Sequence, residues 1–202
     1  MIDLLLATTN PGKRREFSRL LAHLPAHIVT PDELGIQMDV DEPFDTYAEN
    51  ARAKAEAYVR ASGLLTLADD SGIEVAALDW GPGVHTAHFG KSDGRDPERL
   101  AEAVGDNPDR RARMVCVLAL AIPGGDSPRI EVFSGVLQGL VATRPRGSGG
   151  FGYDPVFLLP SGITTAELPE AEKDRISHRG RAVQAATPRL VELLSGAPGA
   201  RT

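Results

Sequence analysis

The chain carries acidic residues whose placement could hold a divalent cation. Asp69 and Asp70 follow one another at the end of an apolar stretch, residues 64–68, and Glu42 lies upstream. Repulsion between adjacent carboxylates is unfavourable unless a cation or hydrogen-bond donors compensate it. A hard cation such as Mg²⁺ binds carboxylate oxygens together with substrate phosphates. The Asp-Ser-Gly sequence that begins at Asp70 is also common in turns, so these residues alone fit a metal site and a turn equally well.

Residues 8–13, Thr-Thr-Asn-Pro-Gly-Lys, could bind phosphate. They stand between an apolar strand and a helix, where free backbone N–H groups and the positive end of the helix dipole attract an anion. Lys13 adds a full positive charge. The segment is not a P-loop, because no glycine stands five residues before Gly12. Taken alone, it also fits an ordinary strand–helix turn with a solvated lysine.

Residues 147–152 match the pattern G-x-G-x-x-G, which in dinucleotide-binding folds joins a strand to a helix. Here an apolar strand follows instead of a helix, so the context of a dinucleotide site is missing. What remains is a flexible backbone beside Phe151, Tyr153 and Asp154. Aromatic rings can stack on a base, and a carboxylate can accept hydrogen bonds from ring N–H groups. The alternative is a surface loop whose aromatic rings pack into the core.

A further polar cluster surrounds the start of a predicted helix: Lys173, Ser177, His178 and Arg179. Basic residues in the first turn of a helix oppose its dipole, which favours a bound anion at this place. A surface ion pair is the alternative. The remaining histidines lack a third ligand at metal spacing, so a zinc site is not expected.

Properties of the whole chain limit the function classes. With 202 residues, a net charge of −6 and 42% hydrophobic residues, the sequence predicts an ordinary globular protein without the basic stripe of a nucleic-acid binder. Its single cysteine, Cys116, lies in an apolar run and is expected in the core. The longest apolar run, residues 114–122, is too short to span a bilayer, and the N-terminus lacks the features of a signal peptide. We therefore expect a cytoplasmic protein that binds neither membranes nor nucleic acids.

The elements that must position these residues alternate at first and then form a hairpin. Periodicity, caps and prolines predict strands at residues 2–7, 64–68, 113–122, 130–141 and 156–159. They predict helices at 11–22, 46–62, 96–104 and from 178 to about 194, with Pro188 breaking or kinking the last one. This order predicts a mixed α/β fold with a partly antiparallel sheet flanked by helices. We expect residues 1–196 to form one domain and residues 197–202 to be a frayed tail.

Five motifs occur in order along the chain: residues 8–13, Glu42 with residues 49–51 and 54–55, residues 68–72, residues 150–155 and residues 177–179. Together they resemble the inosine triphosphate pyrophosphatase family, also called the Ham1 family, over residues 2–195. Five motifs in order are far more specific than any single one, and they favour the functional alternative for each. The resemblance implies an elongated fold of two lobes with a central cleft, usually a homodimer. It also implies Mg²⁺-dependent hydrolysis of ITP, dITP and XTP to the monophosphate and pyrophosphate.

The same resemblance implies roles for particular residues. Asp70 would accept a proton and bind the metal, and Glu42 would be a further metal ligand. Our own interpretation of Asp69 is a weaker ligand or a support. Lys13, the second catalytic residue, would stabilise the pyrophosphate leaving group. The nucleoside triphosphate, as a small-molecule partner, would be bound by Thr8, Thr9, Asn10, Pro11, Gly12, Lys13, Ser71, Phe151, Gly152, Tyr153, Asp154, Lys173, His178 and Arg179.

Two alternatives remain open. A Maf-type pyrophosphatase acts on other nucleotides, but its opening motif is rich in arginine, unlike residues 9–13. A non-catalytic nucleotide-binding regulator would not need to retain Asp70, Lys13 and Glu42. The chain also departs from the pattern of the family it resembles, since residues 85–89 read His-Thr-Ala-His-Phe where that family often has Tyr-Ser-Ala-Arg-Tyr.

Overall fold

The computed structural model describes residues 1–89, 95–125 and 127–196, which form two compact units. Unit 1 comprises Met1–Asp70, Val117–Gly135 and Arg179–Thr202. Unit 2 comprises Ser71–Cys116 and Val136–His178. The tail predicted to fray, residues 197–202, lies outside the described residues.

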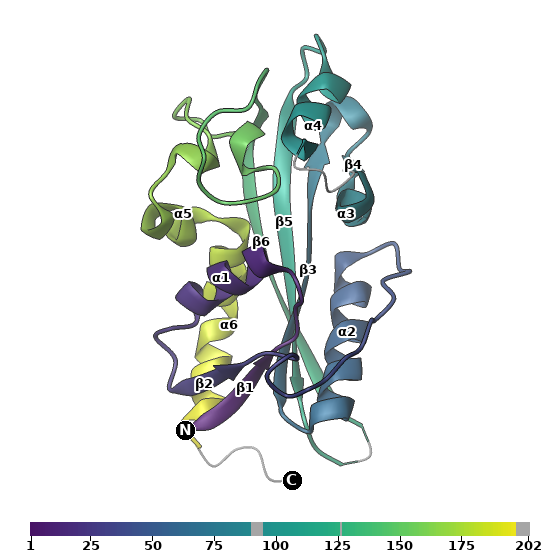
Figure 1. The fold of residues 1–202 in the computed structure, drawn as a ribbon, viewed down its shortest axis with the longest axis vertical. Coiled ribbons are helices and arrows are strands. Elements are labelled where there is room, and N and C mark those ends of the chain that lie inside the picture. The colour runs from purple at the N-terminus through teal and green to yellow at the C-terminus, as the bar shows by residue number, and fades with distance from the viewer. Residues whose placement is uncertain (90–94, 126, 197–202) are drawn as a thin grey trace. The chain divides into compact units, whose positions relative to one another are not determined.

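Figure 1 shows how helices and strands follow one another along the chain. In order, they are β1 (Ile2–Leu6), α1 (Pro11–Leu20), β2 (Ala26–Val29), α2 (Tyr47–Ser62), β3 (Leu65–Val75), η1 (Ala76–Leu78), β4 (Gly81–Pro82), η2 (Gly83–His85), α3 (Thr86–Phe89), α4 (Asp96–Val104), β5 (Arg111–Ile122), β6 (Arg129–Val141), η3 (Asp154–Val156), β7 (Phe157–Leu158), η4 (Thr165–Glu167), α5 (Glu170–Ile176) and α6 (His178–Leu194).

Among the described residues, the strands form one sheet in the order β2-β1-β3-β5-β6-β7, and the short strand β4 pairs with β3. Strand β1 is parallel to β2 and to β3, with Leu5 opposite Val29 and Thr66. Strands β4 and β7 are antiparallel to β3 and β6. The short connection between the neighbouring strands β5 and β6 suits the predicted hairpin, because parallel strands need a long crossover. The predicted mixed α/β fold with a partly antiparallel sheet is confirmed.

In unit 1, a buried strand leads directly into the first helix. The leucines of β1 are at most 1% exposed, so the end of this strand fixes where residues 8–13 begin. Helix α1 starts as predicted: Asn10 Oδ1 accepts the Lys13 N–H at 3.0 Å, and Pro11 takes the first helical position.

Helix α2, which carries Asn50 and Lys54, is also bounded as predicted. Thr46 Oγ1 accepts the Glu49 N–H at 3.2 Å, and Gly63 ends the helix with a φ of +69°, in the left-handed region that favours glycine. Helices α2 and α6 flank the strands of unit 1 (Figure 1). Because Asn50 and Lys54 are four residues apart, they share one face of α2.

Unit 2 has a hydrophobic core of its own. It combines the parts of β3, β5 and β6 that belong to unit 2 with helix α4 and the segment around β7. Its large buried members include Ile73, Val75, Leu100, Val104, Met114, Leu137, Val141, Tyr153, Val156, Phe157 and Leu159.

Several elements differ from the sequence-based prediction. Strand β3 does not stop at residue 68 but continues to Val75, straight through Asp69–Gly72, so these residues form no turn. Strand β2 and helix α5 are short and were not predicted. Helix α4 exists as predicted, although Asp96 is its first residue rather than its cap.

Pro188 was predicted to break or kink the last helix, and the break is wrong. Helix α6 runs from His178, its predicted start, to Leu194 with Pro188 inside it. A proline in a helix removes one backbone hydrogen bond, and its ring crowds the preceding turn. The carbonyl that loses its donor here is that of Gln184, four residues before Pro188. In the same turn Thr187 Oγ1 donates to the neighbouring carbonyl oxygen of Val183 at 2.8 Å.

Two further expectations bear on the whole chain. Cys116 is buried and makes no disulfide, as predicted for a thiol in an apolar strand. Among the helices of the described ranges, none has both the length and the apolar character needed to cross a membrane.

Candidate active site

The segment between β1 and α1 is ordered by local hydrogen bonds. Thr8, which is 7% exposed, accepts the Asn10 N–H on its Oγ1 at 3.3 Å, and its carbonyl oxygen accepts Arg14 Nε–H at 2.9 Å. Residues 9–11 are exposed, whereas Gly12 is buried. The first turn of α1 contains no acidic residue. No side chain of this first turn therefore neutralises the positive end of the helix dipole, and this end can attract a phosphate group.

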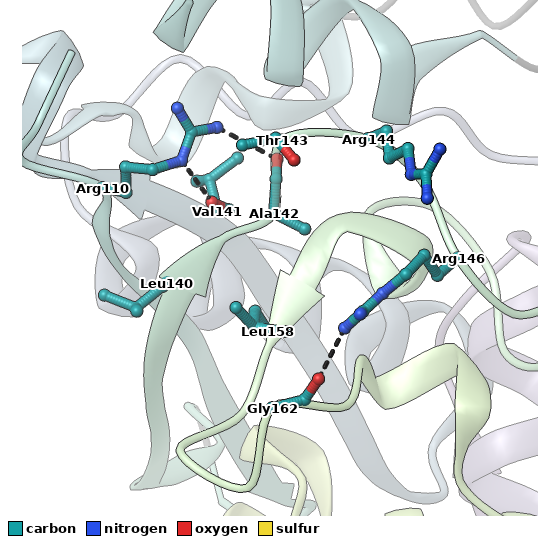
Figure 2. A pocket seen from close by; sticks show the side chains of 9 residues that line it. All are labelled: Arg110, Leu140, Val141, Ala142, Thr143, Arg144, Arg146, Leu158 and Gly162. Atoms are coloured by element: carbon teal, nitrogen blue, oxygen red, sulfur yellow. Dashed lines mark hydrogen bonds between the residues drawn. The ribbon is translucent and has the colours of Figure 1, made fainter. Parts of the chain in front are cut away.

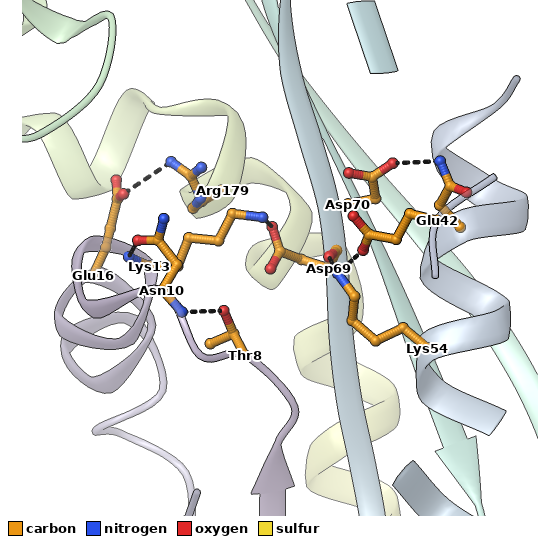
Figure 3. Close-up of polar contacts among 10 residues, drawn as sticks. Thr8, Asn10, Lys13, Glu16, Glu42, Lys54, Asp69, Asp70 and Arg179 are labelled. Atoms are coloured by element: carbon orange, nitrogen blue, oxygen red, sulfur yellow. Dashed lines mark hydrogen bonds and ion pairs between the residues drawn. The ribbon is translucent and has the colours of Figure 1, made fainter. Parts of the chain in front are cut away.

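Asp69 connects this helix start to strand β3 through a buried ion pair. Lys13 Nζ lies 2.9 Å from Asp69 Oδ2, and the Asp69 side chain is 1% exposed (Figure 3). Lys54 Nζ, from α2, donates to the main-chain oxygen of Asp69 at 3.1 Å. Burial raises the pKa of Asp69, but Lys13, Arg179 and Lys54 lower it by more, so the pKa lies below its ordinary value. The ionised carboxylate thus fixes the Lys13 ammonium beside the first turn of α1.

Asp70 faces the other side of β3, because successive side chains of a strand alternate. Figure 3 shows the two carboxylates pointing apart from the same strand. Asn50 Nδ2, from α2, donates to Asp70 Oδ2 at 3.1 Å. The two adjacent aspartates therefore do not face one another, and each has partners of its own.

Asn50 also holds the loop that carries Glu42. Its Oδ1 accepts the Phe44 N–H at 3.0 Å, and its Nδ2 donates to the Phe44 carbonyl oxygen at 3.1 Å. The side chain is 1% exposed, so the amide makes these contacts away from water. Glu42 itself forms an ion pair with Lys54. One buried amide thereby links Asp70 to the loop of the second carboxylate.

The electrostatics of Asp70 differ from those of its neighbour. Burial, followed by the charge of Glu42, raises the pKa of Asp70 to about 6, against the hydrogen bond from Asn50 and the charges of Lys13 and Lys54. Such a carboxylate is largely ionised at neutral pH and is basic enough to accept a proton. Burial lowers the pKa of Lys54, but the carboxylates of Asp69 and Glu42 outweigh it, so the pKa is raised and the ammonium stays charged.

A second buried ion pair joins α1 to the start of α6. Arg179 Nη1 lies 3.1 Å from Glu16 Oε2, and the two side chains are 8% and 2% exposed. Arg179 also contributes to the depressed pKa of Asp69. The arginine is therefore held by one carboxylate while its charge acts on another.

The carboxylates of Asp70 and Glu42 suit a magnesium ion whose other ligands are substrate phosphates and water. Within the described ranges, no group of three or more His, Cys, Asp or Glu side chains is arranged to cage a metal. The charge of Glu42 nevertheless raises the pKa of Asp70, after burial does, and a cation would relieve the repulsion between these two carboxylates. Mg²⁺ is commonly bound by one or two carboxylates together with phosphate oxygens and water.

In unit 2, the glycine-rich loop is built around the carboxylate of Asp154. This group, 2% exposed, accepts Lys173 Nζ at 2.6 Å and the Phe151 N–H at 2.8 Å on Oδ2, and Thr165 Oγ1 at 2.8 Å on Oδ1. A side chain at Gly150, whose φ is +70°, would collide with Asp154 Oδ2 and with Lys173 Nζ. The glycine therefore lets the loop fold onto the ion pair.

The two aromatic rings of this segment have different surroundings. Phe151 is half-buried, and Lys173 Nζ lies 5.4 Å from the centroid of its ring. Tyr153 belongs to the core of unit 2, and burial raises its pKa to about 12. Gly152 stands between them with a φ of +57°. Of the two rings, Phe151 is therefore the more exposed.

Two predicted residues remain, Ser71 and His178. Ser71 follows Asp70 in β3 and is half-buried, and His178 begins α6 and is 4% exposed. The structure therefore brings Thr8–Lys13, Glu42, Asp69, Asp70 and Arg179 together within unit 1. It brings Phe151, Asp154 and Lys173 together within unit 2.

Sequence reasoning left three residues out of the site: Asn50, Lys54 and Glu16. The first two share a face of α2, a spacing that was visible in the sequence but gave no partner. Glu16 lies in α1 one turn beyond Lys13, and an acidic residue on the buried side of an amphipathic helix was the available signal. The long-range partner of each could not be read from spacing.

Comparisons with known proteins agree with the motifs. The profile of the Ham1 family matches residues 4–189. A protein named dITP/XTP pyrophosphatase from Nitrosomonas europaea is 46% identical over 96% of this chain and 95% of its own. One of the same name from Parasynechococcus marenigrum is 42% identical over 98% of this chain and 100% of its own. The solved structure of a HAM1 protein from Coxiella burnetii, 38% identical, superposes with a TM-score of 0.83 over 95% of this chain and 100% of its own.

Proposed function

The chain belongs to the Ham1 family, and we propose from this premise that it hydrolyses non-canonical purine nucleoside triphosphates to the monophosphate and pyrophosphate. The names of its relatives support dITP and XTP as substrates, and ITP carries the same hypoxanthine base as dITP. The observation that carries the chemistry is Asp70, a buried carboxylate with a pKa of about 6, which follows directly in β3 on Asp69, the ion-pair partner of Lys13.

In unit 1, residues 8–13 would hold the triphosphate. The unneutralised start of α1 supplies N–H groups and dipole, and Lys13 supplies a full charge where negative charge grows on the leaving pyrophosphate. Asp69 would keep the Lys13 ammonium in place through their 2.9 Å contact. We therefore assign Asp69 to support of Lys13 rather than to direct metal binding.

Asp70 and Glu42 would hold the magnesium ion, which when bound neutralises phosphate charge and makes the α-phosphorus more electrophilic. Asp70 would also orient a water molecule and accept its proton, a role for which a pKa of about 6 is suited. Asn50 would fix the orientation of Asp70 through its 3.1 Å hydrogen bond. Lys54 would hold Glu42, with which it pairs.

In unit 2, we assign recognition of the base to the segment built on Asp154. Phe151 offers an aromatic face for stacking, and Lys173, His178 and the nearby backbone offer polar groups; Arg179 and Ser71 would contact the nucleotide as well. Asp154 already accepts three hydrogen bonds within the unit. Its contribution would therefore be to hold Lys173 and the loop in place, while Tyr153 supports the loop from the core.

The test of the proposed specificity is a substrate panel. Hypoxanthine and xanthine have a 6-oxo group, which a hydrogen-bond donor can read, whereas the 6-amino group of adenine would leave that donor without a partner. Sites built around such a hydrogen bond discriminate by roughly 10⁴–10⁵ in kcat/KM. We expect ITP and XTP to exceed ATP and CTP in pyrophosphate release at one Mg²⁺ concentration. Guanine shares the 6-oxo group, so lower rates on GTP require that its 2-amino group finds no acceptor in the site. Equal rates on ATP and ITP would contradict this specificity.

The same panel separates the competing functions. A Maf-type enzyme would prefer other nucleotides, and a regulator without catalysis would bind ITP but release no pyrophosphate. We further propose that the enzyme acts in the cytoplasm, where nucleoside triphosphates feed nucleic-acid synthesis, and that it is a homodimer. The dimer rests on the resemblance of the motifs alone, and light scattering coupled to size-exclusion chromatography would measure it.

A further inference from the structure

Unit 2 contains a hollow with an unusual charge. Its volume is about 330 Å³, and it is lined by Arg110, Leu140, Val141, Ala142, Thr143, Arg144, Arg146, Leu158 and Gly162. Three of these residues are arginines and none is acidic, although the whole chain has a net charge of −6. Like charges around one hollow repel unless an anion offsets them. None of the lining residues belongs to the candidate active site.

Arg110 presents a guanidinium that is already fixed in place. It donates to the carbonyl oxygens of Val141 at 2.7 Å, Gly105 at 2.6 Å and Ala142 at 3.0 Å. Carbonyl oxygens hold the group without cancelling its charge. Within the described ranges Arg110 pairs with no carboxylate, so it keeps both its charge and two N–H donors for a ligand.

Arg144 and Arg146 complete the positive lining (Figure 2). Arg146 donates to the Gly162 carbonyl at 2.7 Å and lies 3.5 Å from Glu167, while its buried Nε has no hydrogen-bond partner among the described residues. Arg144 is exposed and forms no hydrogen bond or ion pair with any described residue. A planar guanidinium that remains available is the group that proteins use to bind phosphate at two points.

Apolar side chains make up the rest of the hollow. Leu140, near the end of β6, is 41% exposed. It lies opposite Leu158 of the antiparallel strand β7, and both leucines line the hollow with the arginines (Figure 2). Ligand sites are commonly clefts of about 300–1,000 Å³ with apolar walls and a few polar groups. The combination fits a molecule with a charged end and a flat apolar body.

We propose that this hollow binds a small phosphate monoester that carries an aromatic group. Figure 2 draws the guanidinium groups of Arg110 and Arg144 on opposite sides of residues 142–143. Arg144, which no described residue holds, turns toward Arg110 so that both contact the phosphate, and the aromatic group lies on Leu140 and Leu158. The site is separate in its residues from the machinery assigned above, so its occupancy does not depend on the proposed hydrolysis.

The test is calorimetric titration of the full chain with phenyl phosphate and, separately, with inorganic phosphate. Arg144→Ala should weaken phenyl phosphate binding about tenfold or more, whereas Arg144→Lys, which keeps the charge but not the planar fork, should weaken it less. Leu140→Ala should remove the preference for phenyl phosphate over inorganic phosphate. Because Arg144 and Leu140 are exposed, melting temperatures should stay unchanged.

Two matched variants locate the binding. Arg60→Ala removes an exposed arginine from α2, and Lys13→Ala removes the cation at the phosphate segment of unit 1; both should keep the affinity for phenyl phosphate. Absence of saturable binding by the wild type up to about 10 mM would overturn the proposal. So would equal affinities of Arg144→Ala and the wild type, or a loss of binding in Lys13→Ala instead.

Discussion

Asp69 and Asp70 are consecutive residues of β3, yet their carboxylates have opposite electrostatic surroundings. Asp69 Oδ2 lies 2.9 Å from Lys13 Nζ, and its pKa is depressed. Asp70 Oδ2 accepts a hydrogen bond from Asn50 Nδ2 at 3.1 Å, and burial together with Glu42 raises its pKa to about 6. Because successive side chains of a strand point to opposite sides, Asp69 can hold the Lys13 ammonium while Asp70 remains available as a base.

This difference predicts opposite effects of two matched substitutions on stability. Asp70→Asn removes a charge that is unfavourable in the folded state and should raise the free energy of unfolding by about 1–3 kcal/mol at pH 8 without divalent cations. Asp69→Asn breaks a buried ion pair and should lower it by about 3 kcal/mol. Chemical denaturation in EDTA measures both, and changes of the same sign would contradict the assigned surroundings.

The same two groups predict how stability depends on pH. Since the pKa of Asp70 rises from 3.8 to about 6 on folding, its stabilising effect is complete below about pH 4 and is lost as the pH rises through about 6. Asp69, with a depressed pKa, stabilises above its unfolded pKa and loses that effect as the pH falls through the folded value. Denaturation of the wild type and of Asp70→Asn from pH 4 to 8 in EDTA should therefore give curves that diverge with rising pH. A constant difference across this range would rule out a raised pKa.

Lys13→Ala should raise KM for ITP and lower kcat as well, because negative charge grows on the leaving pyrophosphate. It should also destabilise the fold, since Asp69 loses its ion-pair partner in a site only 1% exposed. The double variant Lys13→Ala with Asp69→Asn should recover part of that stability, so the two losses are not additive. Steady-state kinetics and unfolding curves of the three variants measure this, and additive losses would remove the pair from the account.

Asn50→Ala should lower kcat by about tenfold or more, a part of the roughly 10²–10⁴ that a positioned base contributes. It should also lower the melting temperature by several degrees, because the hydrogen bonds that it removes are buried. Its second readout is independent of activity: amide hydrogen exchange at Phe44 should speed up, because Asn50 holds the backbone of that residue at 3.0 and 3.1 Å. Glu56→Ala, an exposed change on the same helix, is the control. Faster exchange without loss of turnover would leave Asn50 as a support of the loop only.

The sequence predicted local structure well where caps and periodicity are strong, and long-range contacts poorly. Asn10, Thr46 and Gly63 each bounded a helix as expected, because their effects depend on neighbours within a few residues. The strand character of Asp69–Gly72 was missed because polar residues in a strand need tertiary partners, here Lys13 and Asn50, which lie far away in the sequence. The continuous helix through Pro188 likewise depends on packing that a local rule does not contain.

For the site, the sequence indicated which residues take part but not which side chains contact one another. Lys13 and Asp69 were both singled out, yet nothing in their spacing showed that they contact each other. Asp154 was expected to read the base, whereas the structure directs its carboxylate to Lys173, Phe151 and Thr165. Only the fold shows which polar groups already have partners inside the protein.

The most direct test of the central claim is to identify the products formed from ITP. With Mg²⁺ and the purified full chain, ³¹P NMR should show inosine monophosphate and pyrophosphate appearing in equal amounts, with no inosine diphosphate. Asp70→Asn should reduce this turnover by about 10²–10⁴ while remaining folded. Release of orthophosphate and inosine diphosphate, or full activity of Asp70→Asn, would contradict the account.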